Sequence, residues 1–235
     1  MTRAARDLVI LACSGPKLPY AAPALELYQG VMYSTFRAHV RPEAFPDVMI
    51  LSALHGFIRG DAVIEPYDLT LSQQCADRMI HALAGLSGIG WSNGATRVLL
   101  AGGRNYRRVM RAAVPILIDR GCVSARAAIV ETSGGIGCQR QQLAGFLASC
   151  REIVGYRQNG TALYRSLGGF TVGQPVAISY RMRPETRPRP AIIEDLFDGP
   201  AGPTASVLLL DARNPNCART WVGVDDLQAR YDTLF

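Results

Sequence analysis

One lysine stands apart from the other basic residues of the chain. The 235 residues include 24 arginines but a single lysine, Lys17, in the segment Cys-Ser-Gly-Pro-Lys at residues 13–17. An ammonium can lose its proton when it is desolvated, whereas a guanidinium keeps its charge. Because arginine supplies positive charge elsewhere, the amine at this position predicts a site where Lys17 binds or attacks a ligand. The alternative is an ordinary solvated lysine.

An imidazole and two carboxylates follow the second apolar run of the chain. His55, Glu65 and Asp68 lie in this stretch, and the carboxylates flank a Pro-Tyr pair that favours an extended backbone. A carboxylate here can act as acid or base, hold the ammonium of Lys17, or stabilise positive charge on a sugar ring. The alternative is that Asp68 caps the next helix and Glu65 faces water. We predict Lys17, Asp68, Glu65 and His55 as catalytic residues.

Three other loops are of the kind that binds anions or bases. Small residues at 13–15 let a backbone approach a ligand, and glycines before a helix expose N–H groups to an anion. For the glycines at 134–137, the alternative explanation to anion binding is that they allow tight packing between strand and helix. The predicted ligand-binding residues are Cys13, Ser14, Arg104, Tyr106, Gly134, Gly135, Gly137 and Gln139.

Four apolar runs alternate with helical patterns in the first 154 residues. The runs are 7–12, 47–52, 97–101 and 126–131, and the expected helices are 23–39, 71–86, 105–120 and 139–149. This alternation predicts an α/β domain with a mainly parallel, Rossmann-like or flavodoxin-like sheet and helices on both faces. Since ligands bind at the carboxyl ends of such strands, we expect the four polar loops to meet at one edge.

The pattern changes at about residue 155. Short alternating runs at 161–167, 175–181, 191–196, 206–211 and 220–224 predict five strands, followed by a helical turn at 225–231. Five short strands in so few residues favour a small SH3-like β-barrel. We therefore predict a catalytic α/β domain over residues 1–154 and a barrel over 155–235 that contacts nucleic acid or protein.

Composition limits the class of protein, its partners and its cellular location. Hydrophobic residues make up 49% and charged residues 19%, which argues against disorder. The net charge of +6 permits a polyanionic partner, although an arginine-rich composition alone explains it equally well. The six cysteines form no C-x-x-C pair, and no signal peptide or membrane span is evident. We predict a cytoplasmic protein without a metal or cofactor and leave its oligomeric state open.

Several motifs together resemble a known family. They are Cys13-Ser14-x-x-Lys17, residues 26–28, 51–56 and 64–71, and Gly135-Ile136-Gly137-Cys138-Gln139. They resemble a largely uncharacterised bacterial and phage domain that is similar to the peroxide-stress protein YaaA. This resemblance covers most of residues 7–150.

The Cys-Ser-x-x-Lys element is also similar to a motif of archaeosine synthase, which modifies a deazaguanine base in transfer RNA. That resemblance implies a nucleobase held near Lys17. The chain departs from the motif at three positions, where Ala12, Pro23 and Glu26 replace its Pro, Ser and His.

The leading hypothesis is a nucleobase- or nucleotide-directed enzyme that modifies a base in DNA or tRNA. Its expected partner is a nucleotide or a nucleic acid. One alternative is a non-catalytic DNA-binding protein of the stress response. The other is an N-glycosidase of nucleosides or nucleotides, in which His55, Glu65 and Asp68 would dominate.

Overall fold

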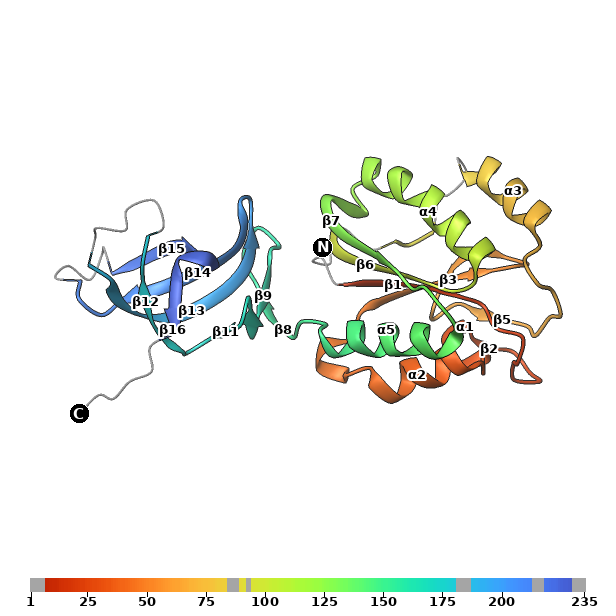
Figure 1. The fold of residues 1–235 in the computed structure, drawn as a ribbon, viewed down its shortest axis with the longest axis horizontal. Coiled ribbons are helices and arrows are strands. Elements are labelled where there is room, and N and C mark those ends of the chain that lie inside the picture. The colour runs from red at the N-terminus through yellow and green to blue at the C-terminus, as the bar shows by residue number, and fades with distance from the viewer. Residues whose placement is uncertain (1–6, 84–88, 92–93, 181–186, 213–217, 230–235) are drawn as a thin grey trace. The chain divides into compact units, whose positions relative to one another are not determined.

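The chain forms two compact units, residues Met1–Cys150 and Arg151–Phe235 (Figure 1). The computed structural model describes residues 7–83, 89–91, 94–180, 187–212 and 218–229. The sequence placed the boundary after residue 154, close to this division. Each unit is described by itself below.

The first unit contains a mixed five-stranded sheet in the order β4-β3-β1-β6-β7. Four strands are parallel and β4 pairs antiparallel with β3. The predicted α/β class and mainly parallel sheet are therefore confirmed. The strands of this sheet are β1 (Leu8–Ala12), β3 (Asp47–Ser52), β4 (Gly56–Arg59), β6 (Ala95–Ala101) and β7 (Val123–Glu131), and a separate pair is formed by β2 (Ala22–Pro23) and β5 (Val63–Ile64).

Helices cover both faces of this sheet, with α3 and α4 on one side and α1, α2 and α5 on the other (Figure 1). No helix in the described ranges is long and apolar enough to cross a membrane. The helices are α1 (Ala24–Leu27), α2 (Val31–His39), the 3-10 helix η1 (Pro42–Ala44), α3 (Gln73–His81), α4 (Arg104–Asp119) and α5 (Ile136–Ala148).

The central strand β1 explains why the sheet needs cover on both sides. Side chains alternate between the faces of a strand, and here Leu8 and Ile10 pack in one core cluster while Val9 and Leu11 pack in the other. All four are fully buried. The outer strand β7 differs, because Ile129 and Val130 are exposed at the edge of the sheet. An apolar run alone does not separate a central strand from an edge strand.

The single helix expected over residues 23–39 is divided into α1 and α2. Tyr28 leaves the helical conformation, and a new helix begins after Gly30. The loop after β1 stabilises the non-helical residues between α1 and α2. Leu18 N–H donates to the carbonyl of Leu27, and Gln29 N–H donates to that of Pro16. Backbone contacts with the preceding loop therefore override local helix propensity.

The second unit is an antiparallel sheet whose main path runs β15-β14-β13-β12-β16, with β9 paired to β13 and β8 paired to β9. The pairings among the described residues leave this sheet unclosed, so they do not show the expected SH3-like barrel. The helical turn expected at 225–231 is found only at its start, where the 3-10 helix η4 (Val224–Asp226) lies, whereas residues 227–229 form a strand and 230–231 lie outside the described residues. The strands are β8 (Ile153–Tyr156), β9 (Ala162–Tyr164), β10 (Ser166–Leu167), β11 (Phe170–Thr171), β12 (Pro175–Ile178), β13 (Arg189–Gly199), β14 (Gly202–Leu209), β15 (Arg219–Gly223) and β16 (Leu227–Ala229).

Candidate functional site

A cavity of about 420 Å³ opens at the carboxyl end of β1 and β6. Numbered along the chain, the four parallel strands stand in the order 2-1-3-4. The connections leaving β1 and β6 therefore run in opposite directions, which creates the crevice where open α/β sheets bind ligands. The cavity is lined by residues 12–14, 16, 30–33, 101–103, 106, 136 and 139.

Three helices begin at this cavity, and each begins after a glycine. The N-cap residues are Gly30 of α2, Gly103 of α4 and Gly135 of α5, and none receives a side-chain cap. The first N–H groups of a helix lack acceptors within the helix. Together with the helix dipole they attract anions. The cavity therefore combines three electropositive helix ends.

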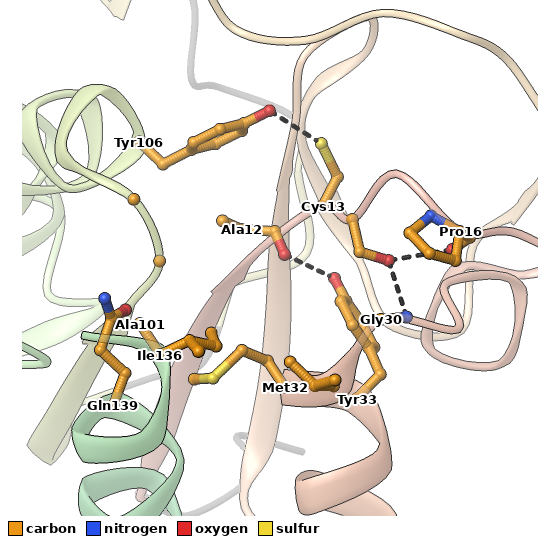
Figure 2. A pocket seen from close by; sticks show the side chains of 14 residues that line it. Ala12, Cys13, Pro16, Gly30, Met32, Tyr33, Ala101, Tyr106, Ile136 and Gln139 are labelled. Atoms are coloured by element: carbon orange, nitrogen blue, oxygen red, sulfur yellow. Dashed lines mark hydrogen bonds between the residues drawn. The ribbon is translucent and has the colours of Figure 1, made fainter.

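The walls between these helix ends are mainly apolar and aromatic. Figure 2 shows the Tyr106 ring on one side of the cavity and Met32 and Ile136 on the other. Tyr33 is fully buried, and its hydroxyl donates to the carbonyl of Ala12 at 3.0 Å. Such walls suit a flat, largely apolar group beside an anion.

The thiol of Cys13 lies at the cavity beside two phenols. Its sulfur is 3.2 Å from the Tyr106 hydroxyl, which also accepts the N–H of Leu71 at 3.2 Å. Burial, followed by the hydrogen bond to Cys13, raises the pKa of Tyr106, and the same two causes raise that of Tyr67. Both phenols therefore stay neutral at physiological pH.

Tyr67 connects Cys13 to a second group of hydroxyls. Its oxygen is 2.7 Å from Ser52 Oγ and 2.8 Å from the hydroxyl of Tyr28. Ser52 Oγ accepts the N–H groups of Leu54 and His55. Those two bonds occupy its lone pairs, so the Ser52 hydroxyl donates to Tyr67. The result is a directed hydrogen-bonded chain that begins at the end of β3.

Sequence reasoning missed Tyr28, Ser52 and Tyr67. Two signals were available, because Ser52 ends a predicted strand and Tyr67 stands between the candidate carboxylates Glu65 and Asp68. Neither signal identifies the hydrogen bonds, which join segments far apart in the chain.

Lys17 lies beside this chain of hydroxyls and outside the residues that line the cavity. Its ammonium is 4.5 Å from the ring centre of Tyr67 and 5.7 Å from that of Tyr28, and it donates to the carbonyl of Gly15 at 3.2 Å. A backbone bridge between Lys17 and Tyr28 holds the loop in place. The amine is thus half-buried against two aromatic faces.

The predicted acid–base residues lie on the exposed flank of Tyr67. Glu65, Asp68 and His55 are exposed, and the His55 ring packs edge-on against Tyr67 at 5.5 Å. Within the described ranges, Lys17 makes no ion pair with either carboxylate. The interpretation of Asp68 as a helix cap is wrong, because Ser72 caps α3.

The predicted ligand-binding residues divide into two groups. Cys13, Ser14, Tyr106 and Gln139 line the cavity, whereas Arg104, Gly134, Gly135 and Gly137 are exposed residues outside its lining. Two hydrogen bonds fix the Gln139 side chain. Its amide nitrogen donates to the carbonyl of Gly134 at 2.9 Å, and its amide oxygen accepts the Thr132 hydroxyl. Three of the four expected loops therefore meet at the cavity, and the fourth is connected to it only indirectly, through the hydrogen bond of Tyr67 with Cys13.

Two other basic side chains of α4 have internal partners. Arg111 forms two hydrogen bonds of 2.6 Å with Glu131, and Arg107 donates to the carbonyl of Gly102 at 2.8 Å. The part of the chain that the structure describes contains no cluster of three or more His, Cys, Asp or Glu residues able to hold a metal.

Comparison with known proteins gives one match. Residues 8–120 match the family model described as Family of unknown function (DUF6884). No curated protein and no solved structure matched the chain. The matched segment runs from β1 through α4, so it includes Cys13, Lys17 and Tyr106 but neither α5 nor the second unit. It names neither the YaaA-like family nor archaeosine synthase, and those resemblances stay predictions.

Proposed function

We propose that the first unit is a nucleotide-directed enzyme that modifies a base of DNA or tRNA. In this proposal the cavity between β1 and β6 holds the target nucleotide. The supporting observation is that three uncapped helix ends surround one apolar-walled cavity at the switch point of the sheet. A nucleotide combines the two chemistries that such a cavity suits, an anion and a flat ring.

The cavity suggests how the nucleotide is oriented. We assign the phosphate to the N–H groups that begin α4 and α5, after Gly103 and Gly135. The base then lies against Tyr106, with Met32 and Ile136 opposite. At about 420 Å³ the cavity is of the size that takes one small ligand. A base in a polymer would therefore enter only after it leaves its stack.

In this proposal the reacting groups are Cys13, which lines the cavity, and Lys17, which lies beyond its lining. Cys13 offers a thiol nucleophile and Lys17 an amine that holds or attacks the ligand. The neutral phenols of Tyr67 and Tyr106 orient the thiol. The His55 ring packs against Tyr67, and Glu65 and Asp68 are its near neighbours in the sequence; in this proposal one of these groups exchanges protons with the bound base.

Calorimetric titration tests the binding site. We expect a nucleoside 5′-monophosphate to bind more tightly than its nucleoside. Gly135→Asp should weaken monophosphate binding about tenfold, because it places a carboxylate on the α5 N–H groups, and should leave nucleoside binding unchanged. Ser72→Asp adds the same charge at the start of α3, which is not among the residues that line the cavity, and serves as the control. Equal effects of the two substitutions, or no binding of either ligand, would remove this site.

Mass spectrometry of nucleosides tests the reaction. DNA and tRNA are compared from cells with and without the protein, and then from cells carrying Lys17→Arg or Cys13→Ala. Loss of a modified nucleoside in Lys17→Arg, which keeps the charge, assigns a reactive role to the amine. Full activity of that variant limits Lys17 to holding the ligand. Release of free base from added nucleotides, without any modified nucleoside, would favour the glycosidase alternative.

A further inference from the structure

The second unit presents a large aromatic side chain to solvent from β15, an edge strand of its sheet. Trp221 on β15 is 62% exposed, and it is the one exposed large apolar residue among the described residues of β13, β14 and β15. Its ring packs edge-on against buried Phe197, with 5.6 Å between ring centres. The indole is therefore anchored along one side while most of its surface faces water.

The guanidinium of Arg157, which has no carboxylate partner among the described residues, packs against this indole. The guanidinium of Arg157 lies 4.3 Å from the ring centre of Trp221 and 4.4 Å from that of Phe197. Its Nη1 is buried and has no hydrogen-bond partner. Among the described residues Arg157 makes no ion pair, whereas four other arginines of this unit do: Arg151, Arg165, Arg189 and Arg219. A positive charge therefore remains unneutralised beneath the exposed ring.

We propose that Trp221, backed by Arg157, is a stacking platform for a base of single-stranded nucleic acid. Every base has a π-face, so an exposed indole binds single strands with little regard to sequence. The guanidinium adds a cation–π contribution and attracts the phosphates. A protein partner is less favoured, because the centre of a protein interface is a broad apolar area. Here Trp221 is the one exposed large apolar side chain among the described residues of β13, β14 and β15, and Arg219 on the same strand is ion-paired to Glu194.

This platform does not depend on the cavity of the first unit. The platform would bind single-stranded nucleic acid on the second unit, whatever reaction the first unit performs. The two proposals can therefore fail separately, and Gly135→Asp should leave stacking on Trp221 unchanged.

The two tryptophans of the chain provide a direct test. Trp91 belongs to the first unit and packs against Phe57. In Trp91→Phe the emission comes from Trp221 alone, and we expect a single-stranded oligothymidylate to quench it. In the matched variant Trp221→Phe only Trp91 remains, and we expect no quenching. Trp91→Phe leaves Trp221 and Arg157 unchanged, so this test remains valid even if Trp221→Ala impairs folding.

Fluorescence anisotropy of a labelled oligothymidylate measures the size of the effect. Trp221→Ala should weaken binding by about fivefold to a hundredfold, the range for loss of one stacked base. Arg157→Gln should also weaken it and should lower the salt dependence by about one phosphate contact. Circular dichroism verifies that both variants are folded.

Three outcomes would overturn the proposal. The first is unchanged Trp221 emission when the oligonucleotide is added to Trp91→Phe. The second is wild-type affinity in folded Trp221→Ala. The third is a dimer in sedimentation that Trp221→Ala converts to monomer with no change in oligonucleotide binding, since this would make the indole a contact between copies of the chain.

Discussion

The helices of the first unit begin in two different ways. At α3, the Ser72 hydroxyl accepts the N–H of Cys75 at 3.2 Å and completes the first turn. At α2, α4 and α5, which begin at the cavity, the corresponding residue is glycine and no side chain caps the helix. A serine or aspartate cap contributes about 1 kcal/mol relative to alanine. The difference indicates that α3 is completed by its own sequence, whereas the cavity helices keep their N–H groups for another acceptor.

The three glycines are not equivalent. A Cβ on Gly30 would lie 2.5 Å from the Cβ of Ser14, so packing alone accounts for this glycine. A Cβ on Gly135 would meet nothing within 4 Å, and one on Gly103 would only touch the Tyr106 ring at 3.9 Å. Both glycines have ordinary extended φ and ψ angles. Neither sterics nor conformation requires them, which leaves the free helix ends as the physical reason.

The largest expected effect comes from Gly30→Ala. The new methyl group must displace Ser14, which accepts the Gly30 N–H at 3.0 Å, and we expect a loss of about 1–3 kcal/mol in the free energy of unfolding. Urea denaturation measures it. Gly135→Ala, where the methyl group has open space, is the control and should cost less. Equal losses would mean that the two glycines do not differ in packing as described.

Ser72→Ala removes the cap of α3 and should cost about 1 kcal/mol of stability. Because neither Ser72 nor α3 is among the residues that line the cavity, the affinity for a nucleoside monophosphate should stay at the wild-type value. Thermal unfolding and calorimetry measure the two quantities on the same sample. A large loss of affinity would place the α3 end in the binding site and would end the distinction between the two kinds of helix start.

Gly135→Asp should stabilise the protein while it weakens monophosphate binding. An aspartate at the N-cap accepts the free N–H groups and interacts well with the helix dipole, which together contribute a few tenths to about 1 kcal/mol. Urea denaturation without ligand measures the gain. If Gly135→Asp lowers stability, α5 does not begin with free N–H groups and the comparison with α3 fails.

The smallest expected effect concerns the pH dependence of stability at the end of β7. The hydrogen bonds from Arg111 lower the pKa of Glu131. This carboxylate therefore stabilises the folded state above its unfolded pKa of about 4.3, and the contribution is lost as the pH falls through the lower folded value. Arg111 is largely exposed, so the contribution is small. Glu131→Gln should be slightly less stable at neutral pH, and the difference from wild type should vanish in acid, as denaturation across pH would measure.

Much of the first unit could be predicted because its signals are local. The apolar runs 7–12 and 47–52 became β1 and β3 almost residue for residue, and α4 begins one residue before the expected 105, whereas α5 begins three residues before the expected 139. The second unit was less predictable. Whether its strands close into a barrel depends on which edge strands pair. The residue pattern of a short alternating run does not identify the strand with which it pairs.

The same distinction holds for Lys17. The sequence by itself determined that a single amine follows the first strand of an α/β sheet, at the edge where such sheets bind ligands. Only the tertiary structure decided its neighbours, which are the rings of Tyr67 and Tyr28 and not the expected carboxylates. The reason is that the loop folds back on residues 27–29 through backbone hydrogen bonds. Such contacts between distant segments are decided by packing, which no local pattern of residue types records.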